Sequence, residues 1–135
     1  MRVMNIDARK GIGLETTRPA LPAGHDVRTL ARFATVIAVS NPSPEKMQGD
    51  ALKTEDVEAA VVGVDAVIQT LGVGLGDLFR PVRLFSDATR VLIAAMRSQV
   101  VKRLICVTGF GACDSRSSIS CLRQFAVPNR LRTRL

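Results

Sequence analysis

Apolar residues along this chain fall into short runs that alternate with longer segments in which they recur every three or four positions. The short runs are residues 2–6, 27–31, 65–70 and 104–107, which have the length and composition of buried strands. The longer segments are residues 12–23, 54–62 and 82–98, which have the period of amphipathic helices. Strands that alternate with helices predict an α/β fold with a parallel sheet and right-handed crossovers.

The first helical segment contains conflicting signals. Ile12, Thr16 and Ala20 lie one turn apart on one predicted face, and Gly24 suits the left-handed residue that follows a helix. Pro19 removes a backbone donor and clashes with the preceding turn, which costs ~3 kcal/mol in a helix interior. We therefore expect a kink or an early end near Pro19.

The other two helical segments have clearer signals. Thr54 is a good N-cap for the second segment, and the two acids that follow it complement the helix dipole. Its predicted apolar stripe is Val57, Ala60 and Val61. The stripe of the third segment is Val82, Phe85, Ala88, Thr89, Leu92, Ala95 and Met96.

A further strand is expected between residues 33 and 49, in one of two places. Residues 35–39 are rich in β-branched side chains and are favoured by propensity. Residues 44–48 are a more polar candidate. The Asn41-Pro42-Ser43-Pro44 stretch between them predicts a turn.

Glycine-rich turns follow three of the predicted strands. They are residues 7–13, 72–76 and 108–111. In a parallel sheet these turns meet at the carboxyl edge, where ligands of open α/β sheets bind. In the dinucleotide motif G-x-G-x-x-G, Gly11 and Gly13 match and Thr16 does not; in the form G-x-x-G-x-x-G, Gly13 is the third glycine, and Asp7 and Lys10 hold the first two positions. The helix that follows offers free N–H groups to a phosphate. An ordinary strand-to-helix turn is the alternative.

Composition narrows the classes of function. The chain has 135 residues, 47% of them hydrophobic, which is enough for one domain with a core. No apolar run reaches the ~18 residues of a membrane span, and early charged residues exclude a signal peptide. Three cysteines without C-x-x-C spacing and a single histidine favour a reducing cytoplasm and argue against a metal site. Cys106, inside an apolar run, is expected to be inert.

The net charge of +7 comes largely from the end of the chain, where arginines follow Arg116 and no acid follows Asp114. A basic tail can bind nucleic acid. Aromatic residues make up only 4% of the chain, however, and none is interleaved with the arginines to stack on bases. A solvated terminus is therefore favoured, and nucleic acid is not an expected partner.

Several stretches resemble the atypical short-chain dehydrogenases, in particular the NmrA-like and the flavin- or biliverdin-reductase-like NAD(P)-binding proteins. The stretches are residues 64–74 and 101–111, supported by residues 24–27, 49–52 and 85–89. The resemblance covers residues 1 to about 116. It implies a Rossmann-like, doubly wound parallel sheet of about five strands in the order 3-2-1-4-5, and it favours residues 44–48 as the third strand. The expected organisation is an NAD(P)-binding domain over 1–116 and a basic tail over 117–135.

The resemblance implies a role for each part of the carboxyl edge. The turn at 7–13 would hold the pyrophosphate through Arg9, Lys10, Gly11, Ile12 and Gly13. Asp50, Ala51 and Leu52 would flank the adenine. Thr70, Leu71, Gly72 and Val73 would line the central cofactor groove, and Thr108, Gly109 and Phe110 would lie near the nicotinamide.

Arg32, at the end of the second strand, would meet the adenosine 2′-phosphate. An NAD-specific site usually has an acid there, whereas this chain has none between Arg32 and Glu45. The planar guanidinium suits a phosphate, so NADP is expected over NAD. Because the chain has no tyrosine, the Tyr-x-x-x-Lys acid/base pair of ordinary short-chain dehydrogenases is excluded, and the catalytic residues stay unassigned.

Two departures from the family pattern bear on function. Asp7 and Lys10 stand where the family has glycines, and a carboxylate at residue 7 repels a pyrophosphate, although Arg9 and Lys10 partly offset that charge. Weak cofactor binding is therefore expected. The family also continues well past 135 residues, so we expect exposed apolar surface, with self-association or ordering of residues 117–127 over it.

Three hypotheses remain open from the sequence. The first is an NAD(P)H-dependent reductase that transfers hydride to a flavin- or quinone-like acceptor. The second is a non-catalytic NAD(P)-sensing protein, and the third is a degenerate fold that binds no cofactor. Measured cofactor binding separates the third from the other two.

Overall fold

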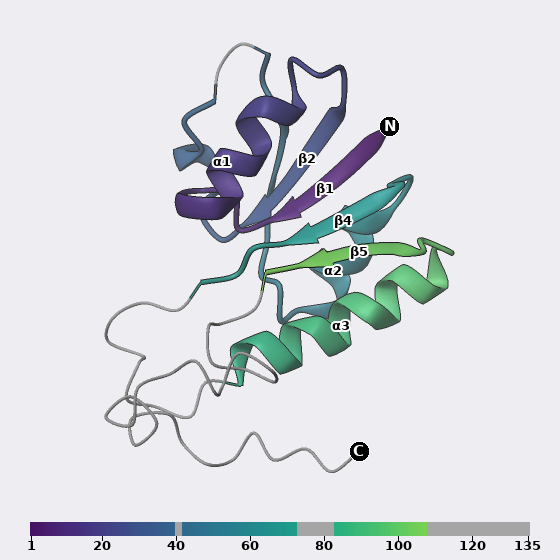
Figure 1. Cartoon of the computed structure of the whole chain (residues 1–135). Helices are drawn as coiled ribbons and strands as arrows, with labels where there is room; N and C mark the ends of the chain where they lie inside the picture. Colours follow the sequence, from purple (N-terminus) through teal and green to yellow (C-terminus); the bar gives the residue numbers. More distant parts are fainter. Residues whose placement is uncertain (40–41, 73–82, 108–135) are drawn as a thin grey trace, which may run out of the picture. The chain divides into compact units, whose positions relative to one another are not determined.

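Five parallel strands form one sheet in the order β3-β2-β1-β4-β5 (Figure 1). They are β1 (Arg2–Ile6), β2 (Asp26–Ala31), β3 (Glu45–Gln48), β4 (Ala66–Gln69) and β5 (Arg103–Cys106). The computed structural model describes residues 1–39, 42–72 and 83–107. The expected strand order and parallel direction are confirmed.

Helices cover both faces of this sheet. They are α1 (Gly11–Ala20), α2 (Thr54–Val61) and α3 (Leu84–Ser98), with a short 3-10 turn η1 (Ala34–Val36). Figure 1 shows α1 on one face and α2 with α3 on the other. None of these helices is long and apolar enough to cross a bilayer, a finding that applies to the described residues.

The main core lies between the sheet and the α2–α3 face. Met4 and Ile6 of β1 and Val67 of β4 are at most 2% exposed and pack there with the apolar stripes of α2 and α3. The expected stripe residues Val57, Ala60 and Val61 are fully buried, as are Leu92 and Ala95 of α3. Residues that alternate with these along the strands, such as Asn5, face the α1 layer.

Helix α1 ends at Ala20, one residue after Pro19, so the expected early end is confirmed and the range 12–23 is too long. The predicted face of Ile12, Thr16 and Ala20 is not the face that α1 buries. Ile12 is 56% exposed, and the buried positions are Gly13 and Thr17. The side chain of Asn5 lies beneath the helix, and its buried amide requires hydrogen-bond partners. Gly13 and Thr17 supply them, so these two positions face the sheet.

The third strand is β3, so the family-based placement is confirmed and the propensity-based alternative of 35–39 is wrong. Residues 34–36 form η1 instead, and Ile37 is buried with Ala34 in a small cluster against Ala8 and Ala31. Because β3 is an edge strand with little buried surface, its polar sequence costs little and carries no strong strand signal.

Two local predictions are corrected. Thr54 is the first helical residue of α2 rather than its N-cap; the cap position is Lys53, and no side chain caps the helix there. The final strand begins at Arg103 and lies at the sheet edge, where Ile105 is 50% exposed and Cys106 is also exposed. Among the described residues β5 pairs with β4 alone, and a strand with one neighbour has faces that are partly open, so its apolar sequence did not imply burial.

Candidate functional site

The carboxyl ends of the strands align along one edge of the sheet. Ile6 of β1 is in register with Leu30 of β2 and Gln69 of β4, and Gln69 is in register with Cys106 of β5. The segments that leave these strands therefore start side by side. This is the edge at which open α/β sheets bind ligands.

The turn after β1 has a demanding backbone. Asp7 adopts φ +63° and Gly11 adopts φ +58°, both in the left-handed region. The Asp7 amide donates to the Leu30 carbonyl oxygen at 2.9 Å, which fixes the start of the turn against β2. Lys10 is fully extended, with φ −157° and ψ 171°. Position 7 therefore favours glycine on conformational grounds, whereas position 10 accepts any residue.

Gly13 lies where α1 packs closely on the sheet. A Cβ at this position would come within 2.4 Å of the Asp7 carbonyl oxygen and 2.5 Å of Thr70 Oγ1. The Gly13 carbonyl accepts from Asn5 Nδ2 at 2.8 Å and from the Thr17 hydroxyl at 2.9 Å. The glycine is thus required for helix–strand packing, a role that the third glycine of dinucleotide-binding turns has.

The hydrogen bonds that Asn5 makes under the turn extend to Thr70, the residue after β4. The Thr70 hydroxyl donates to the Ile6 carbonyl oxygen at 2.7 Å and lies 3.0 Å from Asn5 Oδ1. Both Asn5 and Thr70 are at most 9% exposed. The Thr70 hydroxyl is therefore used inside the fold, joining β4 to β1 and the turn.

The charges of the turn are partly paired with each other. Arg9 Nε lies 3.2 Å from Asp7 Oδ1, and about a quarter of each side chain is exposed. The Arg9 guanidinium also lies over the Phe33 ring, 5.7 Å from its centroid. Lys10 forms no ion pair with any residue that the structure describes. The expected offset of the Asp7 charge therefore comes from Arg9.

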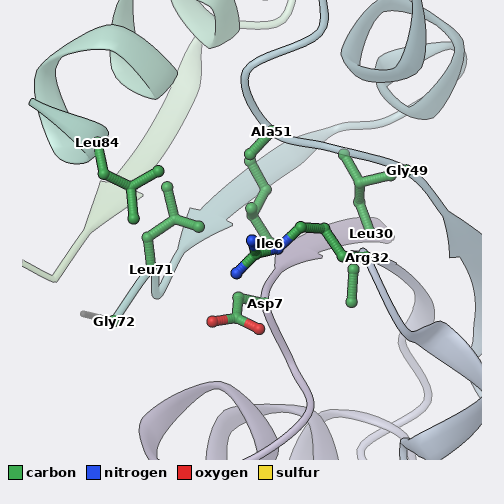
Figure 2. A pocket seen from close by; sticks show the side chains of 10 residues that line it. Ile6, Asp7, Leu30, Arg32, Gly49, Ala51, Leu71, Gly72 and Leu84 are labelled. Atoms are coloured by element: carbon green, nitrogen blue, oxygen red, sulfur yellow. The ribbon is translucent and has the colours of Figure 1, made fainter. Parts of the chain in front are cut away.

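A cavity of about 40 Å³ opens at the ends of β1, β2 and β4 (Figure 2). Figure 2 shows the side chains of Asp7 and Arg32 at this cavity together with Leu71 and Leu84. The other lining residues are Ile6, Leu30, Ala31, Gly49, Ala51 and Gly72. The sequence-predicted residues that meet here are Arg32, Ala51, Leu71 and Gly72.

A second, more open hollow of about 300 Å³ shares Arg32 and Gly49 with the cavity. Its other lining residues are Gln48, Asp50, Lys53 and Asp56. Asp50 was a sequence-predicted site residue, whereas Gln48 and Lys53 were missed. The available signal was their position, since both lie within three residues of Asp50 in the chain.

The remaining sequence-predicted residues are dispersed. Ile12 and Leu52 are 56% and 44% exposed and line neither the cavity nor the hollow. Gly13 and Thr70 are buried in the junction between α1, β1 and β4. Val73, Thr108, Gly109 and Phe110 lie outside the residues that the structure describes.

Cys106 ends β5 at the same edge and is exposed rather than enclosed. Its Sγ lies 3.7 Å from Gln69 Oε1, and partial burial of the sulfur raises the pKa of the thiol. The neutral thiol is thus favoured at neutral pH. Within the described parts of the chain, no cluster of three His, Cys, Asp or Glu side chains is arranged to hold a metal ion.

A family model described as NAD(P)H-binding matches residues 8–129 of this chain. That match includes residues 8–13 of the turn after β1, Arg32, and every strand from β2 onward. It confirms the expected resemblance to NAD(P)-binding proteins.

Solved structures with the same fold agree with this match. A Rossmann-fold NAD(P)-binding family protein from Shigella flexneri is 26% identical, with a TM-score of 0.66 over 84% of this chain and 54% of that one. An oxidoreductase from Lactococcus lactis is 18% identical, with a TM-score of 0.71 over 93% of this chain and 56% of that one. A short-chain dehydrogenase/reductase superfamily protein from Agrobacterium tumefaciens with bound NAD is 18% identical, with a TM-score of 0.64 over 82% and 33%. The chain thus spans about half or less of the length of these structures.

Proposed function

Because the chain belongs to the NAD(P)H-binding family, we propose that it binds NADP(H) along the carboxyl edge of β1, β2 and β4. The family match and the alignment of the strand ends support this placement. The small cavity holds no nucleoside, since small-molecule sites measure roughly 300–1,000 Å³. The dinucleotide therefore lies across the edge and over the cavity.

Each part of the edge has a proposed task. The turn at 7–13 receives the pyrophosphate at the start of α1, with Arg9, Lys10, Gly11, Ile12 and Gly13 as its residues. Arg32 meets the 2′-phosphate. The adenine lies beside Asp50, Ala51 and Leu52, and the central part of the cofactor follows Thr70, Leu71, Gly72 and Val73. Thr108, Gly109 and Phe110 lie near the nicotinamide.

The fit of these residues to a dinucleotide is uneven. Gly13 allows the close approach of α1 that such a turn requires, and Arg32 is exposed beside the cavity. Asp7 places a carboxylate at the start of the turn, where it opposes a pyrophosphate. Binding is therefore proposed to be weaker than in a turn with glycine at position 7.

When bound, the nicotinamide supplies or accepts a hydride. The proposed reaction is reduction of a flavin- or quinone-like acceptor, in which the protein mainly orients two rings and excludes water. This chemistry suits a chain without tyrosine, because it requires no Tyr-x-x-x-Lys proton donor. The chain would act as a reductase domain of about 116 residues with a basic tail over 117–135.

A second candidate is non-catalytic sensing of NAD(P). One observation favours it, the carboxylate of Asp7 at the turn, which opposes a pyrophosphate. Calorimetric titration with NADPH and NADH tests binding itself. Hydride transfer from NADPH to a panel of flavins and quinones then separates the reductase from the sensor, and absence of binding to both cofactors contradicts both candidates.

The observation that carries the choice of NADP is Arg32. It follows β2 directly, lines both the cavity and the hollow, and forms no ion pair with the described residues. Its guanidinium therefore has a full set of donors for a phosphate.

Replacement of Arg32 by alanine is expected to weaken NADP binding by ~1.5–3 kcal/mol, the range of hydrogen bonds to charged groups, and to leave NAD binding nearly unchanged. Titration calorimetry with both cofactors measures the difference. Arg97→Ala, at an exposed arginine near the end of α3, is the matched control and should change neither affinity. Equal losses for both cofactors, or a parent chain that prefers NAD, would remove Arg32 from the site.

A further inference from the structure

The hollow beside Arg32 contains a cation that the sequence did not point to. Lys53 lines it at the N-terminal cap position of α2, and Arg32 lines it from the position directly after β2. Both Arg32 and Lys53 are exposed, and the hollow of about 300 Å³ has room for a phosphate group. A phosphate can bind there only if the side chains of Arg32 and Lys53 are not already engaged with other groups.

The two carboxylates of the hollow are already engaged with the backbone. Asp56 Oδ2 accepts from the Asp50 amide at 2.8 Å. Asp50 Oδ1 accepts from the Leu52 amide at 3.0 Å. These bonds shape the loop between β3 and α2 and use one oxygen of each carboxylate.

The two cations, in contrast, have no partner among the described residues. No ion pair or side-chain hydrogen bond within residues 1–39, 42–72 and 83–107 includes the Arg32 guanidinium or the Lys53 ammonium. A guanidinium offers a planar fork for two phosphate oxygens, and an ammonium offers a mobile point charge for the third. Together they match a terminal phosphate, which has three free oxygens and two negative charges.

We propose that Lys53 is a second cation for the 2′-phosphate of NADP, acting with Arg32. The inference deepens the proposed function and rests on it. It extends the phosphate site from the end of β2 to the start of α2, so that selection for NADP depends on two elements. Asp50 and Asp56 reduce the positive potential of the hollow, so the contribution of Lys53 is expected to be smaller than that of a fully buried cation.

The test compares three variants with the parent chain. Lys53→Gln removes the charge, Lys53→Glu reverses it, and Lys102→Gln removes a charge from an exposed lysine just before β5, at the opposite edge of the sheet. Titration calorimetry measures the affinity for NADPH, NADH and adenosine 2′-monophosphate. Circular dichroism confirms that each variant is folded.

The expected result is a selective loss. Lys53→Gln should weaken NADPH and adenosine 2′-monophosphate about fivefold, the effect of a partly exposed charge pair, and leave NADH unchanged. Lys53→Glu should weaken the two phosphate-bearing ligands further, and Lys102→Gln should change none of the three affinities. The loss should shrink as salt is added, because the contact is exposed.

The outcomes separate this inference from the proposed function. If the parent binds NADPH but both Lys53 variants keep its affinity and its ratio to NADH, Lys53 is not in the phosphate site, and the proposed function stands. If Lys53→Gln weakens NADPH and NADH equally, the role assigned to Lys53 is also overturned. If the parent binds none of the three ligands, the proposed function fails together with this inference.

Discussion

At the scale of single residues, Asp7 and Lys10 look alike in the sequence but differ in their backbone conformation. Asp7 and Lys10 both replace family glycines, but only Asp7 has a positive φ, at +63°. Aspartate tolerates the left-handed region better than most residues, yet it retains a cost on the order of 1 kcal/mol. Its carboxylate adds repulsion toward a pyrophosphate. Position 10 is extended and has no conformational need for glycine.

Asp7→Gly is therefore expected to raise cofactor affinity, because it removes a like charge from the pyrophosphate seat. Stability should change by less than about 1 kcal/mol, since relief of the left-handed strain offsets the loss of a partly exposed ion pair with Arg9. Calorimetry and urea unfolding measure the two quantities.

Lys10→Gly is the control, and it should not raise affinity because it removes a cation without relieving strain. The double variant Asp7→Gly/Lys10→Gly should bind more tightly than the parent. If it binds no better, the turn at 7–13 is not the cofactor seat.

Cys106 provides a second prediction at this scale. Its thiol is exposed, but partial burial of the sulfur raises the pKa above the usual value. A raised pKa lowers the thiolate fraction at neutral pH, and the thiolate is the reactive form. Alkylation of Cys106 by iodoacetamide should therefore be slower in the folded chain than in urea, and should accelerate toward higher pH. Peptide mass spectrometry follows this site apart from the other cysteines; an equal rate in both states would contradict the expectation.

At the scale of elements, the junction of α1, β1 and β4 depends on Gly13. Gly13→Ala should destabilise the fold by roughly 1–3 kcal/mol, the usual cost of overpacking, because its Cβ would meet backbone at 2.4 Å. Gly72→Ala is the matched control, because a Cβ there meets nothing within 4 Å. Urea unfolding of both variants tests the difference, and equal stability of the two would show that α1 can shift to admit the methyl group.

The same junction shows which features of the elements could be predicted from the sequence and which could not. Alternating runs and stripes were sufficient to predict four of the five strands, a parallel sheet and two of the three helix faces, and the family resemblance supplied the strand order. The face of α1 could not be predicted, because the burial of Gly13 and Thr17 depends on Asn5, a residue of another element. The position of β3 required the family resemblance, because propensity favoured residues 35–39.

The candidate site was also predictable only in part. The family resemblance indicated Arg32, Ala51, Leu71 and Gly72, which meet at the cavity. Lys53 was not predictable from strand ends, since it lies at the cap position of α2. The hydrogen bond from the Thr70 hydroxyl to the Ile6 carbonyl oxygen could not be predicted either, because it depends on the pairing of β4 with β1.

At the scale of the whole molecule, the main feature is the edge of the sheet at β5. Among the described residues, β5 pairs only with β4, and Ile105 on it is 50% exposed. An edge strand with an exposed apolar side chain favours association with another chain or segment. Residues 117–127, expected to cover such surface, lie outside the described residues.

We expect this edge to make the chain self-associate in a concentration-dependent way. Ile105→Lys should raise the dissociation constant roughly tenfold, because it removes a side chain whose burial contributes on the order of 2 kcal/mol and adds charge to the edge. Val36→Lys, at a 65% exposed position on η1, is the control and should leave association unchanged. Lys102 and Arg103 lie at the amino end of the same strand, so repulsion between copies opposes pairing, and added salt should strengthen it. Sedimentation velocity over a range of concentrations measures both effects. A parent chain that stays monomeric at every concentration and salt, with residues 117–127 fully accessible to protease, would contradict the expectation.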